Sequence, residues 1–422
     1  MSSPKILLTG ATGYVGGTVL HRLLTCPAPS LQHLKVSVLV RGEERADQLL
    51  RTYGADRVAP VLFRDYDETD LITELASQHD IVINAGSGFH PSSAEAMVQG
   101  LSQRTTTSSS NNNNDTTTTT TSKPWMLHTS GCSNISDRPL TGQAFPDREL
   151  HDADGTTVYD FEKAENEREW YPQRAAELAV LGHPAAASDA VGAVSIQAPC
   201  IFGAGEGLFQ RAGLMVPIMM RYVVEKGYGF QLGDGTGVID YVHVADLADL
   251  YVLCVRDIVE HGGQHLPSGA RGVVFPTSGR VYMKDIAQGC LDAAFGAGVL
   301  PRRGDADELL MDTTPARKFI REVDLQEAAT TTAGNLVVAE VGWAGHRATK
   351  GTVARDSLGW QPRRCEEAWQ QDFVDELGHV VAGQRNVVTI DSCIAEKEVL
   401  PIADGVVGAS GGSAGGAYGV HA

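Results

Sequence analysis

A glycine-rich turn near the start of the chain constrains the fold more than any other feature of the sequence. The segment KILLTGATGYVGG, residues 5–17, is a short apolar run followed by Gly10, Gly13 and Gly16 and then by residues with helical spacing. In such a strand–turn–helix unit, the first glycine permits a tight turn, the second lets backbone N–H groups approach a pyrophosphate, and the third lets helix and strand pack closely. The pattern predicts a dinucleotide site at the N-terminus of the helix.

Apolar runs and helical segments alternate after this turn. Apolar runs at 35–41, 58–65 and 80–87 are separated by polar segments with helical spacing, and further runs follow at 123–131 and 190–207. This alternation is typical of a parallel sheet with helices on both faces. The predicted fold class is therefore α/β, a doubly wound parallel sheet with a smaller mixed C-terminal lobe.

The predicted domain limits lie where the regular alternation of strands and helices becomes less clear. We assign residues 1–200 to the NAD(P)-binding domain and 201–384 to a substrate-binding lobe that is interleaved with the sheet. The tract TTTSSSNNNNDTTTTTTS, residues 105–122, is of low complexity, and we predict a disordered insertion between a helix and a strand. Residues 385–422 end in a Gly/Ser/Ala-rich stretch and are predicted to be largely disordered.

Composition excludes several classes of partner. A formal net charge of −18 argues against nucleic acid, because phosphate binding needs clustered Lys and Arg. No run reaches the roughly 18 apolar residues that a membrane helix needs, and the start MSSPKILLTG lacks the regions of a signal peptide. The 7 cysteines are scattered and contain no Cys-x-x-Cys pair, which indicates a reducing compartment and no zinc site. We expect a cytoplasmic protein with a small-molecule substrate and no metal. Its oligomeric state stays open, with a homodimer among the options.

The end of the second predicted strand indicates which dinucleotide is bound. The strand ends at Arg41 where an acidic residue would hold the ribose of NAD, and Arg45 follows one turn later. A cation at this position suits the 2′-phosphate of NADP, so NADP is the predicted cofactor. NAD remains an alternative, with Arg41 solvated or with Glu43 holding the ribose.

The other predicted cofactor contacts come from the ends of neighbouring strands. Asp65 and Tyr66 follow the third strand and are placed to meet the adenine, and the small residues Ala85, Gly86 and Ser87 follow the fourth strand, where the backbone passes beneath the cofactor. The full predicted set is Gly10, Thr12, Gly13, Tyr14, Val15, Gly16, Arg41, Asp65, Tyr66, Ala85, Gly86, Ser87, Pro199 and Ile201.

Six short motifs together resemble one enzyme superfamily. TGATGYVGG, DIVINAGS, MLHTSG, APCIFGAGEG, DYVHVADLADLY and LGWQP occur in that order within roughly residues 4–380. In this the chain is similar to the short-chain dehydrogenase/reductase superfamily, and more narrowly to its extended and atypical branches, the NAD-dependent epimerase/dehydratase-like proteins. The resemblance implies a Rossmann-type domain with a C-terminal substrate lobe.

The resemblance also implies a catalytic set. In the family, a Ser or Thr after the fifth strand orients the substrate, a Tyr acts as general acid/base, and a Lys four residues later lowers the pKa of that Tyr. Ser130 falls at the family's Ser position; the other interpretation is a strand-end hydroxyl that caps the next turn. His243 and Asp246 match a segment that is usually structural, with Asp246 expected to cap the helix that begins there.

Two Tyr residues compete for the catalytic position. Tyr159 and Lys163 have the family spacing, but 36 residues separate Lys163 from Pro199, and Pro172 would interrupt the helix. Placing Arg174 at the Lys position leaves 25 residues and puts Pro172 in a first helical turn, where Pro is favoured.

In this second register the residue four before Arg174 is Trp170, and Tyr171 lies one position away. We predict Tyr171 and Arg174 as the catalytic pair, with Tyr159 and Lys163 as the alternative pair. The segment YDFEK, residues 159–163, is then a connecting turn. A third interpretation is that neither pair matters and that the segment is a solvated helix.

The leading functional hypothesis is an NADP-dependent oxidoreductase or epimerase/dehydratase-like enzyme that acts on a small organic carbonyl or alcohol. Two other classes stay open because the Tyr/Lys motif is degenerate: a non-catalytic NADP-sensing regulatory protein, and a non-redox lyase or cyclase that reuses the Rossmann pocket. The apolar residues Met215, Met219, Met220 and Tyr222 line a substrate pocket or belong to the core.

Overall fold

The computed structural model describes residues 4–104, 123–300 and 319–384. The predicted disordered insertion at 105–122 and the predicted tail at 385–422 lie outside the described residues.

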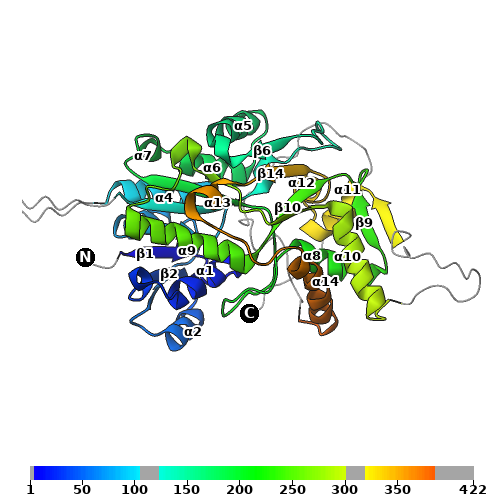
Figure 1. Ribbon diagram of the computed structural model, residues 1–422, viewed down its shortest axis with the longest axis horizontal. Coiled ribbons are helices and arrows are strands. Elements are labelled where there is room, and N and C mark those ends of the chain that lie inside the picture. The colour runs from blue at the N-terminus through cyan, green and yellow to red at the C-terminus, as the bar shows by residue number, and fades with distance from the viewer. Residues whose placement is uncertain (1–3, 105–122, 301–318, 385–422) are drawn as a thin grey trace, which may run out of the picture.

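A seven-stranded parallel sheet forms the larger part of the protein (Figure 1). Its strand order is β11-β7-β5-β4-β1-β2-β3, and every neighbouring pair is parallel. The predicted doubly wound sheet is confirmed. The strands are β1 (Ile6–Thr9), β2 (Val36–Val40), β3 (Val58–Leu62), β4 (Ile81–Asn84), β5 (Trp125–Gly131), β7 (Gly192–Ala198) and β11 (Val273–Val274).

Helices cover both faces of this sheet. Successive side chains of a strand point to opposite faces; Ile6 and Leu8 of β1 pack in one cluster with α1 and α9, whereas Leu7 packs in another with α3, α4 and α6. Strands that are buried on both faces need unbroken apolar runs. Such runs stand out in the sequence, which is why the strands of this sheet could be predicted. The helices are α1 (Tyr14–Thr25), α2 (Glu43–Tyr53), α3 (Thr69–Ser77), α4 (Pro91–Ser102), α5 (Gly155–Arg168), α6 (Pro172–Leu181), α7 (Pro184–Ala187) and α9 (Val244–His261).

A smaller lobe lies beside the carboxyl ends of these strands (Figure 1). It contains a mixed sheet in the order β12-β10-β14-β6, with β8 paired to β10, and a two-stranded sheet of β9 and β13. Its strands are β6 (Glu149–His151), β8 (Cys200–Phe202), β9 (Gly229–Leu232), β10 (Val238–His243), β12 (Gly279–Tyr282), β13 (Ile320–Val323) and β14 (His346–Lys350). Its helices are α8 (Met215–Lys226), α10 (Met283–Gly296), α11 (Leu325–Ala329), α12 (Leu336–Trp343) and α14 (Glu366–Val381), while α13 (Val353–Leu358) leads from β14 back to α9.

The chain passes between the two parts more than once. β6, from within residues 1–200, pairs with β14 of the lobe, whereas β11 and α9, from within 201–384, pack on the first sheet. Each predicted range therefore contributes elements to both parts.

The charged segment around Tyr159 is helical, so the prediction of a connecting turn is wrong. Residues 159–163 lie inside α5, which ends at Arg168, and a second helix, α6, begins at Pro172. The 36 residues between Lys163 and Pro199 thus hold two helices and a short third one instead of one helix and a loop. Helix formers such as Glu, Lys, Ala and Arg fill this stretch and favour α5.

The start of α9 also differs from its prediction. His243 is the N-cap residue, and its Nδ1 accepts a hydrogen bond of 3.1 Å from the backbone N of Ala245. Asp246 instead accepts from the backbone N of Arg363 and Arg364 and from the Arg364 guanidinium at 2.7 Å. Asp246 therefore fixes the segment after α13 to α9 and does not cap the helix.

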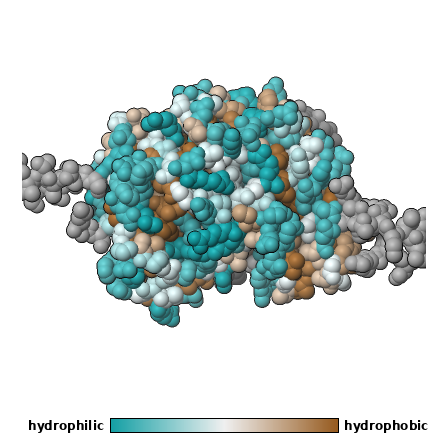
Figure 2. Space-filling view, viewed as in Figure 1, coloured by the Kyte–Doolittle hydropathy of each residue, from teal (hydrophilic) through white to brown (hydrophobic). Residues whose placement is uncertain are grey.

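The surface agrees with a charged sequence. Figure 2 shows a face that is mostly hydrophilic, with apolar residues in small separate areas. Each helix in the described ranges is too short or too polar to cross a membrane.

Candidate active site

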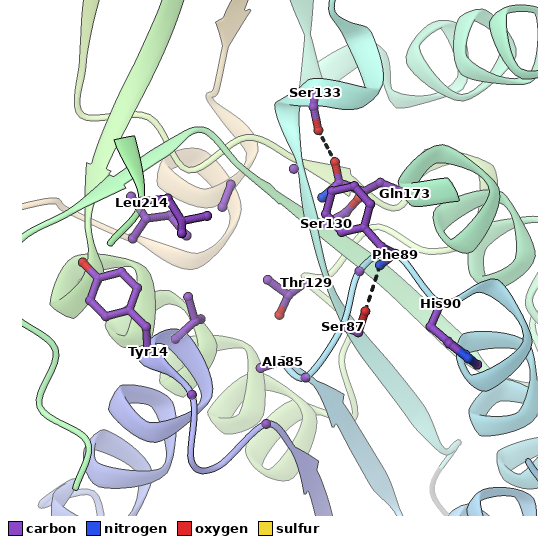
Figure 3. A pocket seen from close by; sticks show the side chains of 18 of the residues that line it. Tyr14, Ala85, Ser87, Phe89, His90, Thr129, Ser130, Ser133, Gln173 and Leu214 are labelled. Carbon is purple, nitrogen blue, oxygen red and sulfur yellow. Dashed lines mark hydrogen bonds between the residues drawn. The ribbon is translucent and has the colours of Figure 1, made fainter. Parts of the chain in front are cut away.

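A cavity of about 1130 Å³ lies between the carboxyl ends of the parallel strands and the lobe. In an open α/β sheet this edge is where ligands bind. Figure 3 shows Tyr14 and Leu214 on one side of it, Thr129 and Ala85 at the centre, and Ser130, Gln173 and Ser133 on another side.

The glycine turn forms one end of the cavity. Gly10 has φ +76°, and a Cβ there would lie 2.2 Å from the carbonyl oxygen of Ala85. A Cβ at Gly16 would lie 2.3 Å from the carbonyl oxygen of Gly10, so Gly16 packs beneath the turn and outside the cavity wall. The backbone N of Gly13 donates to the carbonyl of Gly10 at 2.8 Å and closes the turn.

The N-terminus of α1 fits a diphosphate. Gly13 is its N-cap residue and provides no side-chain cap. The N–H groups of a first helical turn carry the positive end of the helix dipole and are satisfied by an anion. Thr12, Gly13, Tyr14 and Val15 line the cavity at this point. The residues present therefore match the phosphate portion of a dinucleotide.

Positive side chains line the end of the cavity where the sequence predicts contacts with adenine. Arg41, Arg45 and Arg64 line the cavity there, next to Asp65 and Tyr66. Arg64 is also ion-paired with Glu68 at 2.8 Å on the surface. The position after β2 thus carries cations on the cavity wall, as the sequence predicted.

Small residues after β4 let the chain pass closely under this end. A Cβ at Gly86 would lie 1.6 Å from the Tyr66 hydroxyl, so only glycine leaves room for that ring. The backbone N of Gly86 donates to Thr9 Oγ1 at 3.1 Å. Of the predicted cofactor set, every residue except Gly16 lines the cavity, Pro199 and Ile201 included.

Ser130 lies at the end of β5, and its side chain is hydrogen-bonded to neighbouring residues. Asn134 Nδ2 donates to Ser130 Oγ at 3.0 Å and to Glu177 Oε2 at 2.7 Å, and Glu177 also pairs with the Ser130 hydroxyl. Burial raises the pKa of Glu177 above its ordinary value. The neighbouring hydroxyl of Thr129 is bound to the Tyr251 hydroxyl at 2.5 Å.

Tyr171 lies on the cavity wall at the N-cap position of α6. Its ring packs edge-on against Phe89 at 5.9 Å, and its hydroxyl is hydrogen-bonded to the Ser133 side chain. Burial raises the pKa of Tyr171 above its ordinary value, with the Ser133 hydrogen bond and the charges of Arg174 and Arg347 acting in the opposite direction. Tyr171 is therefore a neutral phenol at neutral pH.

Arg174 and Gln173 point in different directions. The Arg174 guanidinium donates to the carbonyl oxygens of Asn134 at 2.9 Å and Glu169 at 3.1 Å and lies behind the wall. Gln173 lines the cavity instead, and Ser133 donates a hydrogen bond to its Oε1 (Figure 3). The structure thus brings Tyr171 and Ser130 into one cavity but turns Arg174 out of it.

The alternative pair is outside the site. Tyr159 packs on the apolar cluster beneath α6, and Lys163 is exposed on α5. Both lie outside the cavity wall. The pair that satisfies the spacing pattern is therefore remote from the predicted cofactor residues.

Sequence reasoning missed several wall residues. Gln173 and Ser133 lie next to residues that were weighed, but nothing in the local pattern shows which side chain of α6 turns inward. Met215 lines the cavity, whereas Met219, Met220 and Tyr222 are buried in the lobe core. The other wall residues include Phe89, His90, Leu214, Ile218, Val338, Val341, Trp343 and Arg347.

One group with metal-ligand chemistry occurs away from the cavity. Ligand atoms of Asp257, His261 and His265 lie within 4.8 Å of one another near the end of α9. His265 Nδ1 contacts Asp257 Oδ1 at 2.5 Å. The three residues lie outside the cavity wall.

Comparisons with known proteins support the architecture. No protein-family model matches the sequence. Oxidase ucsJ from an Acremonium species is 24% identical over 371 residues, which are 85% of this chain and 92% of that protein.

Two solved structures illustrate the similarity in three dimensions. DesIV, a dTDP-glucose 4,6-dehydratase from Streptomyces venezuelae with NAD and TYD bound, has a TM-score of 0.55 and 13% identity, over 90% of this chain and 98% of that one. Vestitone reductase from alfalfa has a TM-score of 0.50 and 14% identity, over 90% and 99%. These likenesses confirm the predicted Rossmann-type α/β fold.

Proposed function

We propose that this chain, which has the extended short-chain dehydrogenase/reductase fold, is an NADP-dependent oxidoreductase acting on a small organic carbonyl or alcohol. The observation that carries the proposal is a single cavity with an uncapped helix N-terminus at one end and the side chains of Ser130 and Tyr171 at the other. The bound structure of DesIV with NAD, and the names of a similar oxidase and a similar reductase, support a redox dinucleotide enzyme.

The residues of this chain would favour NADP over NAD. Arg41 and Arg45 on the cavity wall would hold a 2′-phosphate through charge-assisted hydrogen bonds, while the N–H groups at the start of α1 would hold the diphosphate. When bound, the nicotinamide supplies or accepts a hydride at the substrate carbon.

Tyr171 supplies the proton in this proposal. Its phenol is neutral at neutral pH, so in reduction it donates its proton to the substrate oxygen as negative charge develops there. Ser133 hydrogen-bonds the Tyr171 hydroxyl, and Ser130, whose hydroxyl is held by Asn134 and Glu177, lies on the same cavity wall. Phe89 packs edge-on against the Tyr171 ring on the same cavity wall.

A second candidate rests on Gln173. Gln173, a neutral amide, shares Ser133 with Tyr171, and no Lys lines the cavity within the described ranges. Without an ammonium group beside it, Tyr171 is a weak base, and oxidation of an alcohol needs a base. This observation favours a non-redox lyase or cyclase, or an NADP-sensing protein without turnover, as the competing functions.

Cofactor binding and turnover distinguish these functions. Binding of NADPH and NADH is measured by fluorescence, and NADPH oxidation is then followed with aldehydes and ketones, with and without a carboxylate. Tyr171→Phe is compared with Tyr159→Phe, a matched control that removes a hydroxyl outside the cavity. We expect turnover to fall about 100-fold or more in Tyr171→Phe, within the usual range for a general acid, and to persist in Tyr159→Phe.

Two results would contradict the proposal. Tight NADPH binding with no oxidation across the panel would favour a sensor or a non-redox enzyme. Equal turnover by the wild type and Tyr171→Phe would remove Tyr171 from the chemistry.

A further inference from the structure

A buried arginine lies on the lobe side of the cavity. Arg347 is in β14, paired in register with Ile239 of β10, and only 6% of its surface is exposed. Its Nη2 donates to the carbonyl oxygen of Gly342 at 2.9 Å. Its Nε is buried and has no hydrogen-bond partner within the described ranges. Arg347 nevertheless lines the cavity.

Arg347 has no carboxylate partner among the described residues. Arg174 is equally buried and also has none there, but Arg174 lies outside the cavity wall. Glu340 is ion-paired with Arg138, and Asp246 with Arg364 at 2.7 Å, whereas Arg347 forms no ion pair with any residue that the structure describes. Burying a charge without a partner is costly, because the charge loses its water and gains nothing in exchange.

The nearby acid Asp137 is already occupied. Its Oδ1 accepts from the backbone N of His346 at 2.7 Å, and its Oδ2 accepts from His346 Nδ1 at 2.8 Å and from the backbone N of Phe145. Burial lowers the pKa of Arg347, but a guanidinium begins so far above neutral pH that it stays charged. The guanidinium therefore carries a positive charge at the cavity wall, and its buried Nε has no partner among the described residues.

Much of the cavity wall on the lobe side is apolar. Residues of α12 and of the start of α8 line this end of the cavity: Val338, Val341, Trp343, Met215 and Ile218. The other wall cations, Arg41, Arg45 and Arg64, belong to the adenine end. A single positive charge in apolar surroundings matches a ligand with one negative charge on an apolar body.

We propose that Arg347 binds a carboxylate of the substrate and thereby selects carboxylated compounds with an apolar body. The planar fork of the Arg347 guanidinium lets two of its N–H groups donate to the two oxygens of one carboxylate. A diphosphate would bring at least two negative charges to one cation, which is why a carboxylate is the better match.

The anchor lies close to the proposed chemistry. Arg347 is near enough to Tyr171 for its charge to act on the phenol. A carboxylate held by Arg347 would thus present the rest of the substrate to Tyr171. In naming the substrate class, the inference rests on the proposed function, but anion binding itself needs no turnover and is measured separately.

The test measures binding to the full chain in the presence and absence of NADPH. Calorimetric titrations use three ω-phenylalkanoates of increasing length, their neutral amides, and the corresponding phenylalkyl phosphates. The proteins are the wild type, Arg347→Gln, Arg347→Lys and a matched control, Arg148→Gln. Arg148 also donates to a backbone carbonyl, Ile135 O at 2.6 Å, but lies outside the cavity wall.

We expect at least one carboxylate to bind about tenfold or more tightly than its amide, the order expected for a hydrogen bond to a charged group. The ratio should fall to near one in Arg347→Gln, recover in part in Arg347→Lys, and persist in Arg148→Gln. Because the wild-type ratio needs no variant, the proposal stays falsifiable if Arg347→Gln does not fold.

Three outcomes would overturn the proposal. They are a panel in which no carboxylate binds more tightly than its amide, a preference that survives in Arg347→Gln, and tighter binding of the phosphates than of the carboxylates. Carboxylate binding, together with no NADPH oxidation by any aldehyde or ketone of the turnover panel, would instead support this site and reject the proposed redox function.

Discussion

The carboxyl groups of Glu162 and Glu177 share one amide nitrogen. Nε2 of Gln197 donates to Glu162 Oε1 at 2.7 Å and to Glu177 Oε1 at 2.6 Å, and both acids are completely buried behind Ser130. Burial raises the pKa of Glu162 well above its ordinary value, and the charge of Glu177 raises it further. Two buried carboxylates so close together resist being ionised at once.

This pair makes stability fall as pH rises. An acid whose pKa is raised in the folded state contributes stability that is complete below its unfolded pKa, about 4.5, and is lost as pH rises toward the folded value. Glu162→Gln should reduce the slope of unfolding free energy against pH by up to about 1 kcal/mol per pH unit above that point. Chemical denaturation across a pH series measures it, with Glu167→Gln, exposed on the same helix, as the control. Equal slopes for the wild type and Glu162→Gln would contradict the expectation.

His128 should destabilise the protein in acid. Complete burial lowers its pKa to about 4, and its Nδ1 accepts a hydrogen bond of 3.1 Å from Asn84 Nδ2. A histidine with a lowered pKa contributes stability above its unfolded pKa of about 6.5, and that stability is lost as pH falls toward about 4.

His128→Gln keeps an acceptor for Asn84 and removes the titrating group. Between pH 7 and pH 5, the unfolding free energy of His128→Gln should fall by about 2 kcal/mol less than that of the wild type. The comparison uses the exposed His33→Gln as its control. An acid profile for His128→Gln that overlays the wild type would show that other groups govern the loss.

Arg41 should determine the choice between the two dinucleotides. Because a 2′-phosphate occurs only in NADP(H), Arg41→Ala should weaken NADPH binding about 10- to 100-fold and leave NADH binding nearly unchanged. Fluorescence titration with both dinucleotides measures the ratio, and Arg51→Ala, exposed at the far end of α2, is the control. Parallel losses for both dinucleotides would place Arg41 elsewhere than at the 2′-position.

Gln173 should set the acidity of Tyr171. Both side chains contact Ser133, so the ammonium of Gln173→Lys would lie close to the phenol and lower the pKa of Tyr171 by about one unit or more. Ultraviolet titration measures the shift after subtraction of the spectrum of the same variant carrying Tyr171→Phe. Gln173→Met, which adds no charge, is the control. An unchanged titration would mean that the new ammonium points away from the phenol.

The sequence correctly predicted the elements that depend on residues close to one another in the chain. Residues 6–9 and 81–84 are completely buried apolar strands, and their patterns and the glycine turn depend on neighbours a few residues away. The short β6 and the inward turn of Gln173 depend on partners far along the chain. One residue along a helix rotates a side chain by about 100°. The predicted Arg174 therefore points away from the cavity, whereas its neighbour Gln173, which was not predicted, lines it. Arg347 gave no local signal because its exposure to the cavity depends on the pairing of β14 with β10.

The return of β11 to the first sheet governs the order in which the protein can form during synthesis. Val273 and Val274 complete the edge beside β7, some 75 residues after that strand, and Arg347 joins the cavity later still. A nascent chain therefore exposes the edge of β7 while most of the lobe is still being made. Contacts between residues so far apart in the chain are of the kind that slows folding in general. Ribosome-bound chains that end before β14 would have the glycine turn but no anchor for a substrate.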